Sequence, residues 1–169
     1  MTPEDAGALG VLQAVLEDLG FACHRLTFSN EDTPDIDNLY ARRGDSRPNF
    51  CFAGHTDVVP PGPLDDWSHD PFAATIENNW LIGRGAADMK SSVAAMVCAA
   101  ERFRSRYPGH PGRLAFLLTS DEEGPAQDGT VKVVETLRQL KQYLLSQNYQ
   151  VILEEDTAAM IPGHGLQVA

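Results

Sequence analysis

The second half of the sequence alternates between strand-like and helix-like segments, and this alternation limits the folds that the chain can adopt. Residues 80–90 have the pattern of a strand end that runs into a turn, and residues 91–107 that of a buried helix. Residues 112–124 form a strongly apolar strand that ends in three acids. An amphipathic helix over 130–148 and a last strand over 149–156 follow. This order predicts an α/β fold with a mixed, mostly parallel sheet and flanking helices.

The first half of the sequence predicts one helix and three strands. Thr2, Pro3 and Asp5 have the residue types of an N-cap, a first helical position and a capping acid, and Gly20 can end the helix. Apolar residues recur at helical spacing between them: Leu9, Leu12, Val15, Leu16 and Leu19. Strands are expected over residues 21–28, 37–44 and 49–57, with an acidic, proline-containing loop after the first and a long Pro- and Asp-rich loop after the third.

Composition narrows the classes of partner and the compartment. With 169 residues, 43% of them hydrophobic, the chain can build one domain with a real core. Its formal net charge of −11 repels phosphate backbones, so no nucleic-acid partner is expected. No stretch approaches the roughly 20 apolar residues that span a membrane, and the start lacks the pattern of a signal peptide. Three cysteines without a C-x-x-C pair indicate a reducing compartment, and we expect the cytoplasm.

Polar side chains with metal-binding chemistry follow the predicted strands. In "FAGHTDVVP", His55 and Asp57 lie two residues apart and so face one side of a strand end. Sites in open α/β sheets form beyond the carboxyl ends of strands. One imidazole and several carboxylates, without a thiolate, suit a pair of divalent ions such as zinc or cobalt. The full candidate set is His55, Asp57, Asp88, Asp121, Glu122 and Glu123.

Each of these features also has a purely structural interpretation. A single histidine after a strand is usually solvated, and "DEE" after a strand is often a solvated loop or a helix N-terminus. "GRGAADMKSS" ends like a phosphate loop, but Arg84 and Met89 stand where that loop needs glycine. Trp67 and Phe72 are expected to pack within their loop rather than to stack on bases. The remaining histidines are expected to be structural: His24, His69, His110 and His164.

Several motifs together resemble a known family of enzymes. "FAGHTDVVPPG", "DPF", "LIGRGAADMKSS", "AAERF" and "GRLAFLLTSDEEGPA" are similar to the bacterial succinyl-diaminopimelate desuccinylases, within the dinuclear zinc aminoacylase and carboxypeptidase superfamily. The resemblance covers residues 2–137 and implies the front part of a metallohydrolase catalytic domain. Ser91 is a departure, since the family usually has glycine there. The implied reaction is hydrolysis of N-succinyl-LL-2,6-diaminopimelate to succinate and LL-2,6-diaminopimelate, in lysine and diaminopimelate biosynthesis.

The same resemblance implies a role for each matching residue. His55 and Glu123 are implied to bind one metal ion each, and Asp88 to bridge the two ions through a turn whose Asp88–Met89 peptide is cis. Glu122 is implied to be the general base. Asp57 is implied to hydrogen-bond His55 and fix its ring. From the residue pattern alone, the division of labour between Glu122 and Glu123 stays open.

The resemblance also implies features that this sequence does not contain. In the family, each metal has a third protein ligand, and a second, dimer-forming domain helps to close the site. We therefore expect this chain to bind metal weakly and to have little activity. Residues 138–169 instead resemble the first helix and strand of bacterial NAD kinase, without its glycine-rich catalytic motif. A boundary between 137 and 138 is thus predicted, and a strand is expected over Tyr149–Glu155.

Three alternative functions remain open at this point. The chain can be an inactive metal-binding fragment or a chimera, or an acetylornithine-type deacylase. A nucleotide-binding module built from the tail is the third, and the missing glycine-rich motif argues against it.

Overall fold

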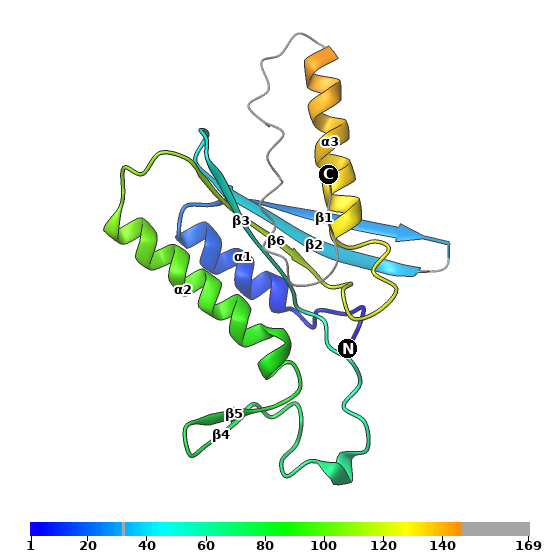
Figure 1. Cartoon of the computed structure of the whole chain (residues 1–169). Helices are drawn as coiled ribbons and strands as arrows, with labels where there is room; N and C mark the ends of the chain where they lie inside the picture. Colours follow the sequence, from blue (N-terminus) through cyan, green and yellow to red (C-terminus); the bar gives the residue numbers. More distant parts are fainter. Residues whose placement is uncertain (32, 147–169) are drawn as a thin grey trace.

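The structure is a computed structural model that describes residues 1–31 and 33–146 (Figure 1). Within these residues, the main sheet has the strand order β1-β2-β6-β3, and a separate hairpin pairs β4 with β5. The strands are β1 (Ala22–Asn30), β2 (Thr33–Arg43), β3 (Asn49–His55), β4 (Thr75–Glu77), β5 (Trp80–Ile82) and β6 (Arg113–Thr119). The helices are α1 (Ala8–Asp18), α2 (Ser91–Arg106) and α3 (Thr130–Ser146), with short helical turns η1 (Leu64–Asp66) and η2 (Ala86–Lys90).

Strand β6 lies in the interior of the main sheet, which explains its continuous apolar sequence. It pairs antiparallel with β2 and parallel with β3, and each of its residues is buried. In the parallel pair, His55 lies opposite Thr119. The carboxyl ends of β3 and β6 therefore meet at one edge of the sheet, as the predicted site requires.

The predicted α/β fold with a mixed sheet and flanking helices is confirmed, but the expected predominance of parallel pairing is wrong. Among the described strands, only β3 and β6 pair in parallel, whereas β1–β2 and β2–β6 are antiparallel. The reason is that β1 and β2 form a hairpin. The expected loop between them is mostly strand, because β1 extends to Asn30 and β2 begins at Thr33.

Helices α1 and α2 share one face of the main sheet (Figure 1). Both contribute to one apolar core with the alternate residues Leu114, Phe116 and Leu118 of β6. The sequence predicts a buried helix over residues 91–107, but the buried residues of α2 form a single stripe: Val93, Val97 and Ala100. Alanine is small and tolerates exposure, so the alanine-rich start of α2 does not require burial on every side.

The predicted start of the first helix is wrong, although its end is confirmed. Helix α1 begins at Ala8, so Thr2 is not its N-cap and Pro3 is not its first residue. Instead, the Thr2 N–H donates to the Val58 carbonyl, at 2.9 Å, and ties the N-terminal segment to the loop after β3. Asp5 does act as a capping acid, because its carboxylate accepts the Leu9 N–H at 2.7 Å.

Helix α3 starts on the opposite face of the sheet from α1 and α2. Asn38 of β2 alternates with the core residue Leu39, and its side-chain amide donates to the Asp128 carbonyl just before α3. The predicted boundary at 137/138 falls inside this helix and stays a prediction. The strand expected over Tyr149–Glu155 lies outside the described residues. Among the described helices, none is long and apolar enough to cross a membrane.

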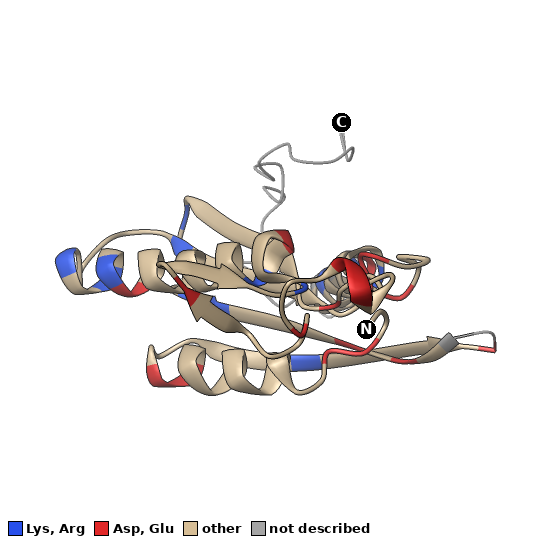
Figure 2. Cartoon of the chain, turned by 90° about the horizontal axis from the view of Figure 1, so that it is seen from below, with Lys and Arg blue, Asp and Glu red and all other residues tan. Residues whose placement is uncertain are grey.

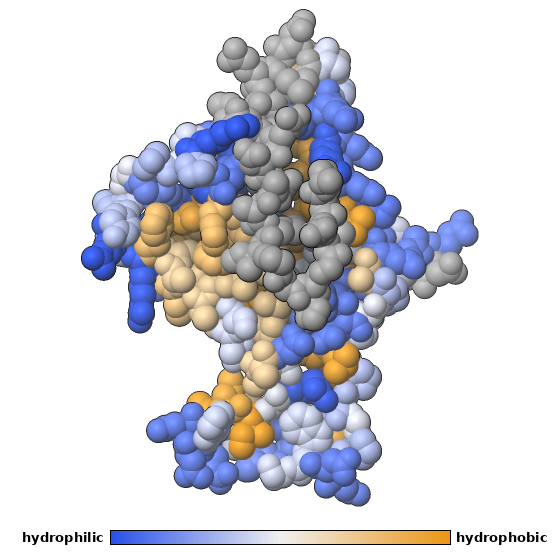
Figure 3. Space-filling view, viewed as in Figure 1, coloured by the Kyte–Doolittle hydropathy of each residue, from blue (hydrophilic) through white to orange (hydrophobic). Residues whose placement is uncertain are grey.

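The hairpin of β4 and β5 projects from the end of the molecule near the start of α2 (Figure 1). Large apolar side chains are exposed on and beside it: Phe72, Ile76, Trp80 and Leu81. Figure 3 shows orange, hydrophobic atoms on this arm. Charge is distributed unevenly over the rest of the fold. Figure 2 shows basic residues at the far end of α2 and acidic segments near the N-terminus.

Candidate metal centre

The first part of the candidate site lies where β3 leaves the sheet. The Thr56 N–H donates to the Thr119 carbonyl at 2.9 Å, so the chain stays beside β6 for one residue beyond His55. His55 and Asp57 are almost fully buried, with 4% and 1% of their surface exposed. Two polar side chains at this depth need partners, because an unpaired buried charge is costly. Their partners come from two other segments of the chain.

The second part of the site is the turn η2, which carries Asp88 to the end of β3. Gly85, at φ 79°, begins this turn, and the Asp88–Met89 peptide is cis, as the family resemblance implies. Met89 packs against Gly54, where a Cβ atom would lie only 3.2 Å from the Met89 Cε. A glycine directly before His55 therefore allows this close approach.

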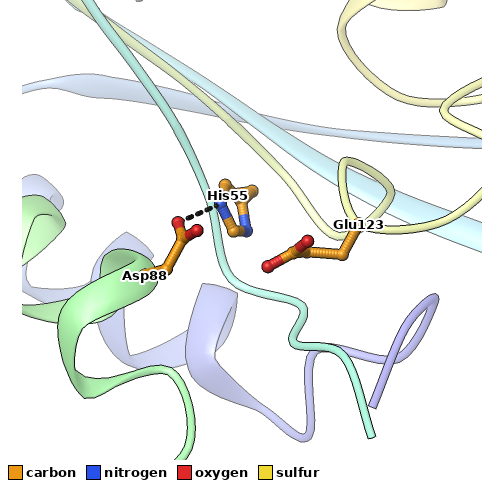
Figure 4. Close-up of side chains that lie close together, drawn as sticks. All are labelled: His55, Asp88 and Glu123. Carbon is orange, nitrogen blue, oxygen red and sulfur yellow. Dashed lines mark hydrogen bonds and ion pairs between the residues drawn. The ribbon is translucent and has the colours of Figure 1, made fainter.

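Three potential ligands converge on one point, as Figure 4 shows. One donor atom from each of His55, Asp88 and Glu123 lies within 4.8 Å of the others. The His55 Nε2 is 3.1 Å from the Asp88 Oδ1. His55 is buried, whereas Asp88 is exposed, so the cluster is open to solvent on its carboxylate side. One imidazole and two carboxylates are a donor set that suits a divalent ion such as zinc.

Glu122 lies at the rim of this cluster. Its Oε2 is 3.7 Å from the His55 Nε2, and its side chain is 50% exposed. Adjacent residues Glu122 and Glu123 thus both reach the site, as expected from the sequence. A carboxylate that is close to the ligands yet solvent-accessible can exchange protons with a water molecule there.

Asp57 connects the two sides of the site. Its carboxylate accepts the N–H groups of Glu122, at 3.2 Å, and Glu123, at 3.0 Å. The His55 Nδ1 faces the same residue, at 3.1 Å from its carbonyl and 3.5 Å from its Oδ1. This arrangement places the Nδ1 proton toward Asp57 and leaves Nε2 free to coordinate a metal ion. The family resemblance implies a contact of Asp57 with His55, but the contact of Asp57 with the backbone of the acidic loop was not predicted from the sequence.

The electrostatics of the site favour positive charge. Burial alone would lower the pKa of His55, but hydrogen bonds to Asp57 and the nearby carboxylates outweigh it and raise this pKa to about 9. Burial likewise opposes ionisation of Asp57, yet hydrogen bonds from His55 and Glu123 keep its pKa below the usual value. Desolvation and the charge of Asp88 raise the pKa of Glu123. Protons therefore compete with a metal ion for His55 and Glu123.

Asp121, the first acid of "DEE", has a structural role rather than a place in the cluster. Its carboxylate accepts the N–H groups of Ala126, at 3.1 Å, and Asp128, at 3.0 Å. Asn38 donates to the Asp128 carbonyl at 3.0 Å and anchors the same loop to β2. The loop that presents Glu122 and Glu123 is thus held at both ends.

The expected loop packing of Trp67 is confirmed. Its Nε1 donates to the Pro61 carbonyl at 2.9 Å, and the Arg84 guanidinium lies 5.3 Å from the centre of its ring. Phe72, by contrast, is 56% exposed. Three of the histidines that we expected to be structural lie outside the cluster: His24, His69 and His110. His164 lies outside the described residues.

Comparison with known proteins agrees with this fold and site. A family model described as Peptidase family M20/M25/M40 matches residues 51–165, and the chain belongs to this family. Curated relatives include the succinyl-diaminopimelate desuccinylase of Parvibaculum lavamentivorans, 58% identical over 137 residues, or 81% of this chain and 34% of the relative. The enzyme of the same name from Thiobacillus denitrificans is 54% identical over 159 residues, or 94% of this chain and 38% of the relative. The chain therefore spans about a third of the length of the curated relatives it matches.

Solved structures support the same fold. Human carnosine dipeptidase 1 superposes with a TM-score of 0.64 and 27% identity, over 76% of this chain and 28% of that one. An M20 family metallo-carboxypeptidase from Sulfolobus solfataricus superposes with a TM-score of 0.57 and 25% identity, over 71% of this chain and 25% of that one.

Proposed function

We propose that this chain supplies the metal-binding part of an amide hydrolase that converts N-succinyl-LL-2,6-diaminopimelate to succinate and LL-2,6-diaminopimelate. The convergence of His55, Asp88 and Glu123 within 4.8 Å is the observation that carries the proposal. The relatives of that name support the choice of substrate. Lysine and diaminopimelate biosynthesis in the cytoplasm is the corresponding role, and the three free cysteines support a reducing compartment.

The residues at the site have complementary parts in this proposal. His55 and Glu123 would each hold one of two divalent ions, zinc or cobalt, and Asp88 would be the carboxylate shared by both. Such ions, when bound, polarise an amide carbonyl and lower the pKa of water. Glu122 takes the proton from the attacking water and returns it to the leaving amine. Asp57 keeps the His55 Nε2 directed at the site and positions the backbone of both glutamates.

The proposal is tested first by metal binding. We expect calorimetric titration with Zn²⁺ to detect weak binding, because the three donors of the described residues are shared between two ions. His55→Ala should abolish zinc binding. His24→Ala, which changes a histidine on β1 outside the cluster, should leave zinc binding intact. Equal zinc binding by the His55→Ala variant would contradict the proposed ligand set.

The second test is hydrolysis of N-succinyl-LL-2,6-diaminopimelate with added Zn²⁺ or Co²⁺. Turnover is expected far below the ordinary enzyme rate of about 10 per second. Glu122→Ala should remove it, and Glu135→Ala on the surface of α3 is the matched control. Faster hydrolysis of N-acetylornithine than of the succinyl substrate would favour the acetylornithine-type alternative. Zinc binding without hydrolysis of either substrate would favour an inactive metal-binding fragment.

A further inference from the structure

Lys90 lies at the start of α2, where a helix favours negative rather than positive charge. It is the N-cap residue of α2, and its side chain makes no capping hydrogen bond. A cation near this end opposes the helix dipole by about 0.3–1 kcal/mol. Departures from local preference of this kind concentrate at functional sites. The reason for a lysine at this position must therefore lie outside the helix.

The side chain of Lys90 reaches the end of β3 instead. Its ammonium group donates to the carbonyl oxygen of Thr56, the residue between His55 and Asp57. Thr56 is itself fixed to β6 through its N–H, and only 2% of its surface is exposed. The Lys90 N–H donates to the Gly85 carbonyl at 2.9 Å, which fixes the other end of the contact within η2.

Apolar contacts flank this hydrogen bond and restrict movement of η2 relative to the end of β3. On the side of Thr56 toward β3, Met89 packs against Gly54. On the other side of Thr56, Gly85 lies so close to Val58 that a Cβ atom on Gly85 would come within 2.5 Å of the Val58 Cγ1. The Lys90 ammonium thus makes a polar contact in a closely packed interface between η2 and the end of β3, beside that of His55 with Asp88.

The charges around the site add a second reason for a cation here. Four carboxylates approach the centre and repel one another, those of Asp57, Asp88, Glu122 and Glu123. The ammonium of Lys90 interacts favourably with Asp57 and with Asp5 of the N-terminal segment. A fixed positive charge beside the ligands lowers the cost of gathering these acids.

We propose that Lys90 is a positioning residue for the metal centre. Its ammonium ties the end of β3 to the turn that carries Asp88, and so holds the His55 Nε2 and the Asp88 Oδ1 close enough to bind adjacent ions. The role rests on the proposed metal centre, but it does not depend on which amide is hydrolysed. Lys90 contacts neither a substrate nor a ligand atom in this role.

The test compares Lys90→Met with Lys90→Arg and with Lys132→Met. Methionine keeps most of the length of the side chain but removes the donor, and arginine keeps the charge. Lys132 is the control, because it lies on the exposed side of α3 and its ion pair among the described residues is with Glu135, at 3.6 Å. Co²⁺ is titrated into each protein and followed by visible absorption. Amide hydrogen exchange is measured separately without metal.

We expect Lys90→Met to weaken Co²⁺ binding by about 10–100-fold, the usual effect of losing a group that orients ligands. Lys90→Arg should recover part of this loss, and Lys132→Met should bind as the unaltered chain does. In metal-free Lys90→Met, exchange should accelerate at Thr56 and at residue 90 but not in the middle of β6. Co²⁺ affinity within about twofold of the unaltered chain, or unchanged exchange at both positions, would overturn the proposal.

Two further outcomes separate this inference from the proposed function. If Lys90→Met does not fold, Lys90→Gln is measured in its place against the same criteria. If the unaltered chain binds no Co²⁺ while exchange still accelerates at both positions in Lys90→Met, the metal centre is refuted and the tie between η2 and β3 stands. A purely structural lysine would lower the unfolding midpoint without changing the Co²⁺ affinity of the folded protein.

Discussion

Replacing Asp57 by asparagine should remove two interactions whose contributions can be separated by pH. The first is the pairing with His55, whose pKa rises from 6.5 to about 9. At 1.36 kcal/mol per unit, this shift corresponds to at most about 3 kcal/mol of stability. The second is acceptance of the Glu122 and Glu123 N–H groups, of which asparagine can satisfy one. A buried donor left unpaired costs about 1–3 kcal/mol.

The two contributions depend differently on pH. Because the pKa of His55 is higher in the folded state, its contribution is fully present below pH 6.5 and disappears as the pH rises through about 9. The pKa of Asp57 is lowered from 3.8, so its own ionisation contributes a constant amount over this range. Asp57→Asn should therefore cost several kcal/mol at about pH 6 and only the backbone contribution at about pH 9.5.

Urea unfolding in the presence of a chelator measures the loss of stability at each of these two pH values. Titration of the His55 ring by NMR gives its pKa directly. Asp37→Asn is the matched control. The pKa of Asp37 is also lowered, by a hydrogen bond from Thr27 and by Arg25, but among the described residues it has no histidine partner. Its loss of stability should be the same at both pH values. An equal loss at both pH values for Asp57→Asn would refute the reasoning.

Three other outcomes are expected. Below about pH 9, apparent Zn²⁺ affinity should fall by about tenfold per pH unit, because His55 must lose its proton to bind; calorimetry in buffers of different ionisation enthalpy would show the released proton. Gly85→Ala should lower both stability and Zn²⁺ affinity more than Gly62→Ala, since both glycines have a φ near 80° but only the first would clash with a neighbour. Phe116→Ala, fully buried, should reduce the free energy of unfolding by about 3–5 kcal/mol, and Phe50→Ala, 40% exposed, by clearly less in the same urea series.

The meeting of His55, Asp88 and Glu123 could be predicted from the sequence because it depends on sheet geometry. An apolar strand that ends in a residue able to bind metal is visible in the sequence. Neighbouring parallel strands bring such ends to one edge of the sheet. The parallel register of β3 with β6 provides this arrangement. The placement of Asp88 was inferred from its turn and from the family resemblance.

Features that depend on loop conformation could not be predicted in this way. The contact of Asp57 with the Glu122 and Glu123 N–H groups requires the exact path of the chain after β6. The sequence presented Lys90 only as the end of a failed phosphate-loop pattern, because its contact with Thr56 arises from the turn. Thr2 has the residue type of an N-cap, but a tertiary hydrogen bond to Val58 overrides that local preference.

The spacing of the three ligands along the chain has a consequence for folding. His55 and Asp88 are 33 residues apart, and Asp88 and Glu123 are separated by a similar length. In the proposed two-ion centre, one ion between His55 and Asp88 and a second between Asp88 and Glu123 would close two loops of this size, as a pair of covalent cross-links would. In the chain-entropy model, each such closure is worth about 3–4 kcal/mol through the unfolded state. The centre would then be a reversible cross-link between the end of β3, the turn η2 and the loop after β6. Removal of metal by a chelator would loosen the packing of these three segments as well as the site.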